Sequence, residues 1–180
     1  NNTVVNNFLS QMNPVVDLVR RHGFDVGPVA AVVGCGHVPW APLRLLAEGA
    51  HQVFANDVLP VQAEWDPGDI ALLSQALHRV APYLAHNLDS IGVNPETLVV
   101  GGGVRFEEAG LAESSVDFLF STSVLEHVDD PAAVYAEMAR VVPSGGVAFH
   151  SIDLRDHRNF DRPLDFLELT GDEYAEWETE

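Results

Sequence analysis

The sequence predicts an α/β domain built on a doubly wound, mostly parallel sheet. Short apolar runs of the kind that buried strands need alternate along the chain with segments whose apolar residues recur at helical spacing. The first run, 29–33, ends in a Gly-Cys-Gly turn, and the second, 52–56, ends at Asp57. An acid about 20 residues after such a turn is typical of sheets that bind a nucleotide at the carboxyl ends of their strands.

The composition is that of one acidic globular domain. The chain has 180 residues, 47% of them hydrophobic, which is enough for one sizeable core. Its 27 acidic and 9 basic residues give a formal net charge of -18, and all the basic residues are arginine. Such a charge repels phosphate backbones and anionic lipid headgroups. We therefore expect neither nucleic acid nor a membrane surface as a partner.

Cysteine usage and the length of the apolar runs exclude further classes of protein. Cys35 is the only cysteine, so the chain forms no internal disulfide and no multi-cysteine metal site. No apolar run approaches the roughly 20 residues of a membrane span, and no basic and then apolar leader precedes the fold. We expect a cytoplasmic protein. We predict no metal, because the spacing of histidines and acids matches no strong metal motif.

Helices are predicted before and after the first strand in the sequence. One covers 3–12, and another starts at Asn13 and ends before Gly23, because each segment carries an apolar stripe at helical spacing. Residues 1–28 are therefore expected to cover the first strand or the site. A third helix, over 40–48, follows the glycine turn, with proline tolerated in its first turn.

The middle of the chain contains a long helical pattern and a glycine-rich strand. The pattern spans 70–91, and Pro82 is expected to kink or split it. The third strand is predicted over 97–104 and contains three consecutive glycines at 101–103. These glycines either let a cofactor lie close to the backbone or form a bulge.

Two further strands complete the predicted sheet. The fourth covers 116–120, and the loop that leaves its carboxyl end covers 121–128. Asp129 or Asp130 is expected to cap the next helix, and the fifth strand is predicted over 147–152. Strands and helices in this alternation form a parallel sheet with right-handed connections.

Two blocks of the sequence together resemble the class I S-adenosylmethionine-dependent methyltransferases, in particular the small-molecule branch known as the type 11 methyltransferase domain. The blocks are VAAVVGCGHVPW…VFANDV and SSVDFLFSTSVLEHVDDPAAVYAEMARVVPSGGVAFHSIDL. The resemblance covers roughly 29–154. It implies the Rossmann-like methyltransferase fold, S-adenosylmethionine as cofactor, and methyl transfer to a small-molecule acceptor. The segment SIDLRDHRNFDRPLDFL resembles a subgroup associated with sugars or secondary metabolites.

The resemblance also assigns a cofactor site. The implied contacts are Gly34, Cys35, Gly36 and His37 at the methionine part, Asp57 at the ribose hydroxyls, Val58 and Glu107 at the adenine, and Ser121 and Ser123 beneath the sulfonium. The sequence departs from the family at Val38, where S-adenosylmethionine enzymes have a third glycine. This departure either shifts the amino-acid end of the cofactor or abolishes binding.

His127, His150 and Asp153 are the candidate catalytic residues, because they lie at the predicted carboxyl ends of the fourth and fifth strands. A general base is needed only if the acceptor must lose a proton, and a neutral imidazole can accept one near pH 7. His127 is therefore the first candidate, with loop anchoring as its alternative role. Glu126 is expected to anchor a backbone amide or to orient His127, and His150 could instead be a core residue.

The C-terminal segment, 155–180, is acidic and is expected on the acceptor side. The resembled family generally ends with two more strands, whereas nothing after Ile152 reads as a strand pair. A truncated chain and an oligomer that completes the sheet through its edge are both consistent with this pattern. Two other functions remain open: an NAD-dependent oxidoreductase, which shares the glycine turn and Asp57, and a non-catalytic binding domain of the same fold.

Overall fold

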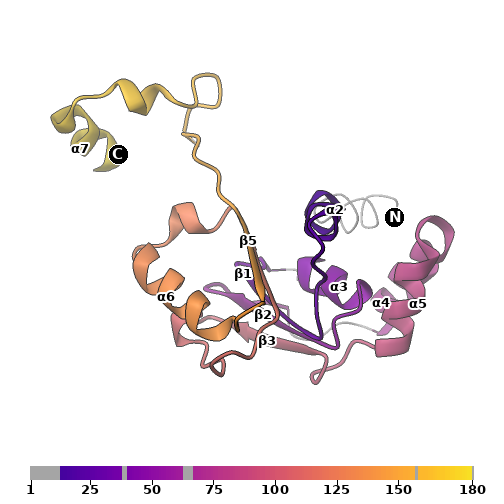
Figure 1. Ribbon diagram of the computed structural model, residues 1–180. Helices are drawn as coiled ribbons and strands as arrows, with labels where there is room; N and C mark the ends of the chain where they lie inside the picture. The colour runs from indigo at the N-terminus through magenta and orange to yellow at the C-terminus, as the bar shows by residue number, and fades with distance from the viewer. Residues whose placement is uncertain (1–12, 38–39, 63–66, 157, 180) are drawn as a thin grey trace.

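The computed structural model describes residues 13–37, 40–62, 67–156 and 158–179. They form a five-stranded, wholly parallel sheet with the strand order β3-β2-β1-β4-β5 (Figure 1). The strands are β1 (Val29–Val33), β2 (Gln52–Asp57), β3 (Leu98–Gly102), β4 (Phe118–Thr122) and β5 (Val147–Ser151). The order runs outward from β1 in both directions, so the doubly wound fold predicted from the sequence is confirmed.

Helices cover both faces of this sheet. The helices are α2 (Asn13–Arg21), α3 (Trp40–Ala47), α4 (Pro67–Val80), α5 (Pro82–Ile91), α6 (Pro131–Val141) and α7 (Gly171–Thr179), with short 3-10 turns η1 (Phe106–Glu108), η2 (Leu125–His127) and η3 (Asp165–Glu168). In Figure 1, α6 lies on the opposite side of the sheet from α2 and α3. None of the described helices has the length and apolar character that crossing a bilayer requires.

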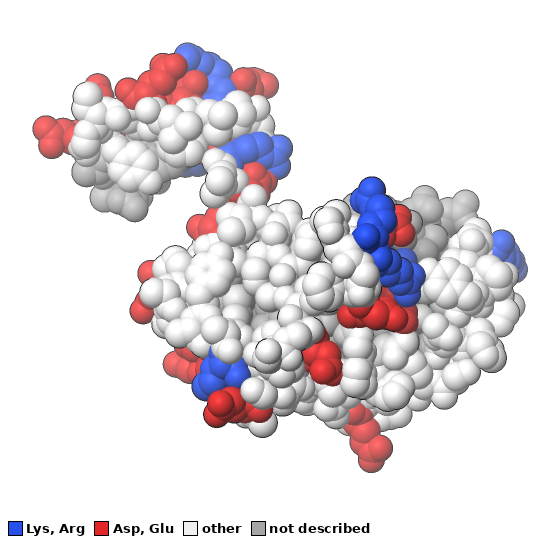
Figure 2. All heavy atoms as spheres, in the orientation of Figure 1, with Lys and Arg blue, Asp and Glu red and all other residues white. Residues whose placement is uncertain are grey.

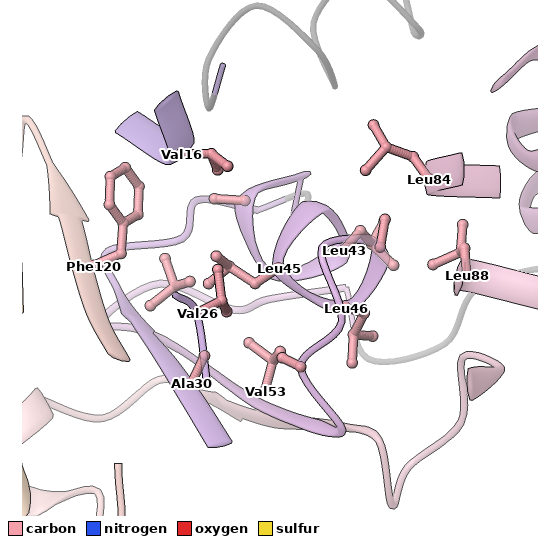
Figure 3. Packing of buried hydrophobic residues seen from close by; sticks show 14 of the residues in the cluster. Val16, Val26, Ala30, Leu43, Leu45, Leu46, Val53, Leu84, Leu88 and Phe120 are labelled. Carbon is pink, nitrogen blue, oxygen red and sulfur yellow. The ribbon is translucent and has the colours of Figure 1, made fainter. Parts of the chain in front are cut away.

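The central strand β1 shows why its sequence is apolar at every position. Ala30 and Val32 pack into the larger core, which also receives residues of α2, α3, α4 and α5, while Ala31 and Val33 pack into a second core with α6. Figure 3 shows the larger core, in which Val16, Leu45, Leu84 and Phe120 come from different elements. A strand that is covered on both faces has no polar side, so its sequence does not alternate.

Pro82 splits the predicted long helix rather than kinking it. α4 ends at Val80 and α5 begins at Pro82, with Ala81 between them in a non-helical conformation (φ -151°, ψ 67°). Proline has no N–H to donate to the preceding turn, but its fixed φ suits the first position of a new helix. The other predicted N-terminal helix, over 3–12, lies outside the described residues.

The third strand is shorter than predicted, and its glycines have different roles. β3 ends at Gly102 because Gly103 has a positive φ of 79°, and its N–H donates to the carbonyl of Leu59 as well as to that of Asp57. A Cβ on Gly102 would lie 2.6 Å from the backbone nitrogen of Val61, so this glycine allows two chain segments to approach closely. Gly103, in contrast, has open space around its Cα.

The boundaries of the fourth and fifth strands also differ from the prediction. β4 begins at Phe118, not at position 116, since Val116 donates its N–H to the carbonyl of Val141 at the end of α6. It continues to Thr122, into the segment that was predicted as a loop. Of the two predicted caps of α6, Asp130 is the residue observed, because its Oδ1 accepts the Ala133 N–H at 3.0 Å.

The chain leaves the sheet after Ser151 (Figure 1). In the described part of the chain, residues 152–179 contain η3 and α7 but no strand, and no strand pairs with the outer edge of β5. Large apolar side chains are exposed along this segment: Ile152, Leu154, Phe160, Leu164, Leu167 and Tyr174. The expected absence of a strand pair after Ile152 therefore matches the residues that the structure describes.

A buried carboxylate joins three helices on the larger core. The side chain of Glu48, which directly follows α3, is fully buried and accepts the guanidinium of Arg44 at 2.7 Å and that of Arg20 in α2 at 2.7 Å. The hydroxyl of Tyr83 in α5 lies 3.4 Å from the same carboxylate. A buried charge must be paired, so this cluster fixes where α2 sits against α3 and α5.

We expect Glu48→Ala to lower the free energy of unfolding by about 3 to 5 kcal/mol, because it leaves the 2%-exposed Arg44 without its carboxylate. Arg20→Ala is the matched control. Its side chain is 42% exposed, so its loss should cost only about 1 kcal/mol or less. Urea unfolding of both variants measures the difference. Equal losses of unfolding free energy in the two variants would contradict the role of Glu48 as the buried carboxylate that joins the helices.

Candidate active site

A cavity of about 810 Å³ opens at the carboxyl ends of the strands. Its walls come from four strand exits: those of β1, β2 and β3, and the β4–α6 connection. The lining residues are Val33, Gly34, Gly36, Asn56, Asp57, Val58, Leu59, Gly103, Val104, Arg105, Phe106, Glu107, Glu108, Ser123, Val124, His127, Val128, Asp129, Asp130 and Val134. Its volume lies in the range of small-molecule sites, about 300 to 1,000 Å³. This edge is where an open α/β sheet binds its ligands.

Asp57 joins two of these walls. It is the last residue of β2 and is only 8% exposed. One carboxylate oxygen, Oδ2, accepts the Gly36 N–H at 2.8 Å, and the other, Oδ1, accepts the Leu59 N–H at 2.8 Å. A carboxylate offers about four lone-pair positions, so two of them remain available for a ligand in the cavity.

The two glycines of the β1 exit serve different purposes. Both have a positive φ, 68° at Gly34 and 76° at Gly36. A Cβ on Gly34 would lie 2.1 Å from Val124 Cγ2, so this glycine lets the β1 exit pack against the β4 exit. A Cβ on Gly36 would meet nothing within 4 Å. Because Gly36 also lines the cavity, its bare backbone forms part of the cavity surface.

An apolar wall and an ion pair complete the cavity. Val58 and Leu59 line it and are 64% and 62% exposed, so they give the cavity an apolar surface that a ligand can contact. On the facing side, Arg105 Nη2 lies 2.7 Å from Asp129 Oδ2 and thereby joins the β3 exit to the β4–α6 connection. Arg105 Nη1 is also 4.0 Å from Glu107 Oε1.

The structure brings some of the sequence-predicted residues to the cavity and leaves others outside its lining. Those that line it are Gly34, Gly36, Asp57, Val58, Glu107, Ser123 and His127. Those that do not are Cys35, His37, Ser121, His150 and Asp153. His37 instead places Nδ1 3.0 Å from the carbonyl of Pro60 and so ties the β1 exit to the segment after β2. Burial, together with the nearby carboxylate of Asp57, raises the pKa of the Cys35 thiol to about 12, so this cysteine is not a nucleophile at neutral pH.

Ser121 and His150 form a pair outside the cavity lining. They are register partners on β4 and β5, and Ser121 Oγ lies 2.8 Å from His150 Nδ1. Ser121 is fully buried, and the Tyr135 ring of α6 meets the His150 ring edge-on, with the centroids 6.1 Å apart. Burial lowers the pKa of His150 below its ordinary value. The ring is therefore neutral at pH 7 and held in one orientation.

Glu126 and Asp153 connect the β4 exit to the end of β5. Glu126 Oε1 accepts the backbone N–H of Asp153 at 3.2 Å, which is the first of the two roles expected for this glutamate. The Asp153 carboxylate accepts the guanidinium of Arg155, with Nε 2.8 Å from Oδ1. Glu126 Oε2 is buried and has no hydrogen-bond donor among the described residues. Within the same residues, no cluster of three or more His, Cys, Asp or Glu side chains could hold a metal ion.

Several cavity residues were not predicted from the sequence. Asn56 is 5% exposed, and its Nδ2 donates to the carbonyls of Gly101 and Val104, both at 3.1 Å, which holds the β3 exit in place. A polar residue at the end of an apolar strand is the signal that could have identified it. The contacts of Val124 with Gly34 and of Arg105 with Asp129 have no such signal, because each joins segments that are far apart in sequence.

The fold and this cavity define a doubly wound domain of the class whose members bind their ligands at the carboxyl edge of the sheet. The family model described as Methyltransferase domain matches residues 32–150. The match covers more than half of the chain, so the chain belongs to the methyltransferase domain family. This result favours the methyltransferase interpretation over the NAD-dependent alternative. Curated protein sequences yielded no significant match.

Solved structures of similar fold span longer chains. An S-adenosylmethionine-dependent methyltransferase from Mesorhizobium loti is 18% identical with a TM-score of 0.49, and the match covers 76% of this chain and 52% of that one. A protein from Methanococcus maripaludis that is described as an S-adenosyl-L-methionine-dependent methyltransferase is 16% identical with a TM-score of 0.49, over 81% of this chain and 59% of that one. The [4+2]-cyclase SpnF is 19% identical with a TM-score of 0.47, over 76% and 43%. The chain thus spans about half the length of these structures.

The cavity fits S-adenosylmethionine, the cofactor expected from the sequence. It offers a buried carboxylate with free lone pairs at Asp57, a bare backbone at Gly36 and an exposed apolar wall at Val58 and Leu59. A ribose with two hydroxyls, a polar amino-acid end and a flat apolar base need these three kinds of surface. The missing third glycine, at Val38, lies outside the described residues.

His150 should make stability depend on pH. Because its folded-state pKa is lowered, the unfolded chain binds this proton at a higher pH than the folded protein does, and the free energy of unfolding falls as pH drops below about 6.5. His150→Gln should remove this contribution, which is at most about 1.4 kcal/mol per pH unit. Urea unfolding of parent and variant across this range measures the two slopes. His86→Gln, at an exposed position on α5, is the control, and equal slopes for parent and His150→Gln would contradict the effect.

Proposed function

We propose that the chain binds S-adenosylmethionine in this cavity and transfers its methyl group to a small-molecule acceptor. The observation that carries the proposal is the buried carboxylate of Asp57, which lies in the cavity at the end of β2. Membership of the methyltransferase domain family supports the same conclusion. So does the surface charge, since the face in Figure 2 shows its larger groups of basic side chains beside acidic ones and no continuous basic area that would suit a nucleic acid.

Each wall of the cavity has a distinct role in this proposal. Asp57 accepts hydrogen bonds from the ribose hydroxyls while it keeps its two backbone amides. Gly34 and Gly36 bring the β1 exit close to the methionine part, and Val58 packs on the adenine. Glu107, whose side chain is 24% exposed on the cavity wall, faces the amine of the base.

The chemistry requires alignment more than acid–base assistance. The cofactor supplies a methyl group that is already activated by a positively charged sulfur. The chain must exclude water and hold the acceptor nucleophile in line with that methyl group. If the acceptor reacts through a group that carries a proton, His127 on η2 is the residue on the cavity wall that can take it onto an imidazole nitrogen.

The acceptor is proposed to be a small molecule such as a sugar or a secondary metabolite. A cavity of about 810 Å³ must hold both the cofactor and the reacting part of the acceptor. This space limits the part of the acceptor that enters to a compact group. Ser123 and His127 form the wall at the β4 exit, on the side of the cavity next to β5, and are the proposed acceptor contacts.

Asp57→Ala tests the cofactor site. The variant loses acceptors for the ribose hydroxyls, so affinity for S-adenosylhomocysteine should fall about tenfold or more. It also removes the acceptor of two backbone amides, so thermal stability should fall as well. Isothermal titration of the folded variant separates the two effects, and Asp161→Ala in the exposed C-terminal segment is the control. Heat with NAD and none with S-adenosylhomocysteine would refute the proposal.

His127→Gln tests the base. Glutamine retains a hydrogen-bonding side chain of similar reach, so affinity for S-adenosylhomocysteine should survive while single-turnover methyl transfer falls by roughly 10² to 10⁴. His78→Gln, at an exposed position on α4, is the matched control. The acceptor for this assay comes from screening small hydroxyl and amine compounds for S-adenosylhomocysteine release. Turnover within about threefold of the parent would remove His127 from the mechanism.

A further inference from the structure

We propose that the cavity discriminates by charge between the two forms of the cofactor. Its negative charge attracts cationic S-adenosylmethionine more strongly than neutral S-adenosylhomocysteine. The product therefore binds less tightly than the substrate. This inference rests on the proposed function and adds a property of the same site. It concerns the summed charge of the acidic side chains on the cavity wall, of which cofactor recognition uses only Asp57 and Glu107.

The cavity wall carries a strong excess of negative charge. Among the described residues, five carboxylates and one guanidinium line it: Asp57, Glu107, Glu108, Asp129 and Asp130, and Arg105. The guanidinium is already engaged, because Asp129 lies 2.7 Å from Arg105 and Glu107 lies 4.0 Å from it. Arg105 therefore offsets part of the charge of its two neighbours and leaves a net negative wall.

The remaining acids are not neutralised by other side chains that line the cavity. Asp57 and Asp130 bind backbone N–H groups, at Gly36 and Leu59 and at Ala133, and these bonds stabilise the charged form rather than remove its charge. Glu108 is exposed at the edge of the cavity. The field from this wall thus acts on whatever ligand the cavity holds.

The two cofactor forms differ by one unit of charge. In methyl transfer, a lone pair of the acceptor forms the new bond to carbon, and the electron pair of the broken carbon–sulfur bond stays on sulfur. The sulfonium thereby becomes a neutral thioether, and the net charge of the ligand falls from +1 to zero. The attraction to the acidic wall is lost in the same step. The wall therefore holds the product less tightly than the substrate.

The size of this change in affinity follows from the distance between the wall charges and the ligand charge. Charges separated by about 10 Å, at the high dielectric of an open cavity and at low ionic strength, change an affinity by about two- to threefold for each carboxylate. Removing two carboxylates should therefore change the preference between a cationic and a neutral ligand by about fivefold. Salt should reduce this effect, because the Debye length shortens to about 3 Å at 1 M.

The test compares sinefungin, which carries an ammonium in place of the methylated sulfonium, with S-adenosylhomocysteine. The variant is Glu108→Gln combined with Asp130→Asn, because asparagine caps a helix as well as aspartate does and so preserves α6. The matched control is Glu96→Gln combined with Glu168→Gln, which removes two charges at exposed positions outside the cavity lining. Isothermal titration at about 0.01 M and about 0.5 M salt gives the ratio of the two affinities.

In the cavity variant, the preference for sinefungin over S-adenosylhomocysteine should fall by about fivefold at low salt and by less than about twofold at high salt. The control should keep the ratio of the parent. If both double variants change the ratio equally, or neither does, local charge discrimination is wrong although the cofactor site stands. If the parent binds neither ligand, the proposed function fails and the inference fails with it.

Discussion

The carboxylate of Asp57 is the contact on which the geometry of the cavity depends. It holds the N–H groups of Gly36 and Leu59, so it fixes the exit of β1 and the turn after β2 at the same time. In the proposed function the same group also accepts the ribose hydroxyls. One side chain then determines both the shape of the site and its chemistry, so loss of Asp57 should affect ligand binding and local order together.

The elements that the sequence predicted well are those whose signals are local. β1 has the predicted bounds because its apolar run is limited by Pro28 and Gly34, and the break at Pro82 follows from the missing N–H of proline. The ends of β3 and β4 were predicted less well. They depend on the backbone bonds from Gly103 to Leu59 and from Val116 to Val141, which join distant segments that periodicity does not reveal.

The candidate site likewise contains features with a local sequence signal and features that depend on distant contacts. The glycine turn and Asp57 were identified from their spacing, and both reach the cavity. The acidic wall was not identified, because it assembles from the exits of β2 and β3 and from the β4–α6 connection only after folding. His150 and Ser121 illustrate the opposite case, since residues at a strand end that read as site residues form a pair outside the cavity lining.

The strand order has a consequence for the path of folding. β1 pairs with β2 across a short connection, whereas its other neighbour, β4, lies much later in the chain. Just before β4, the Asp117 carboxylate accepts the N–H of Val29 at 3.0 Å, across a separation of 88 residues. Closing the longer loop costs roughly 1 kcal/mol more entropy than closing the shorter one. The topology therefore favours early assembly of β1 with β2 and late closure of the seam between β1 and β4. The cavity, which needs the β4 exit, is complete only once that seam has closed.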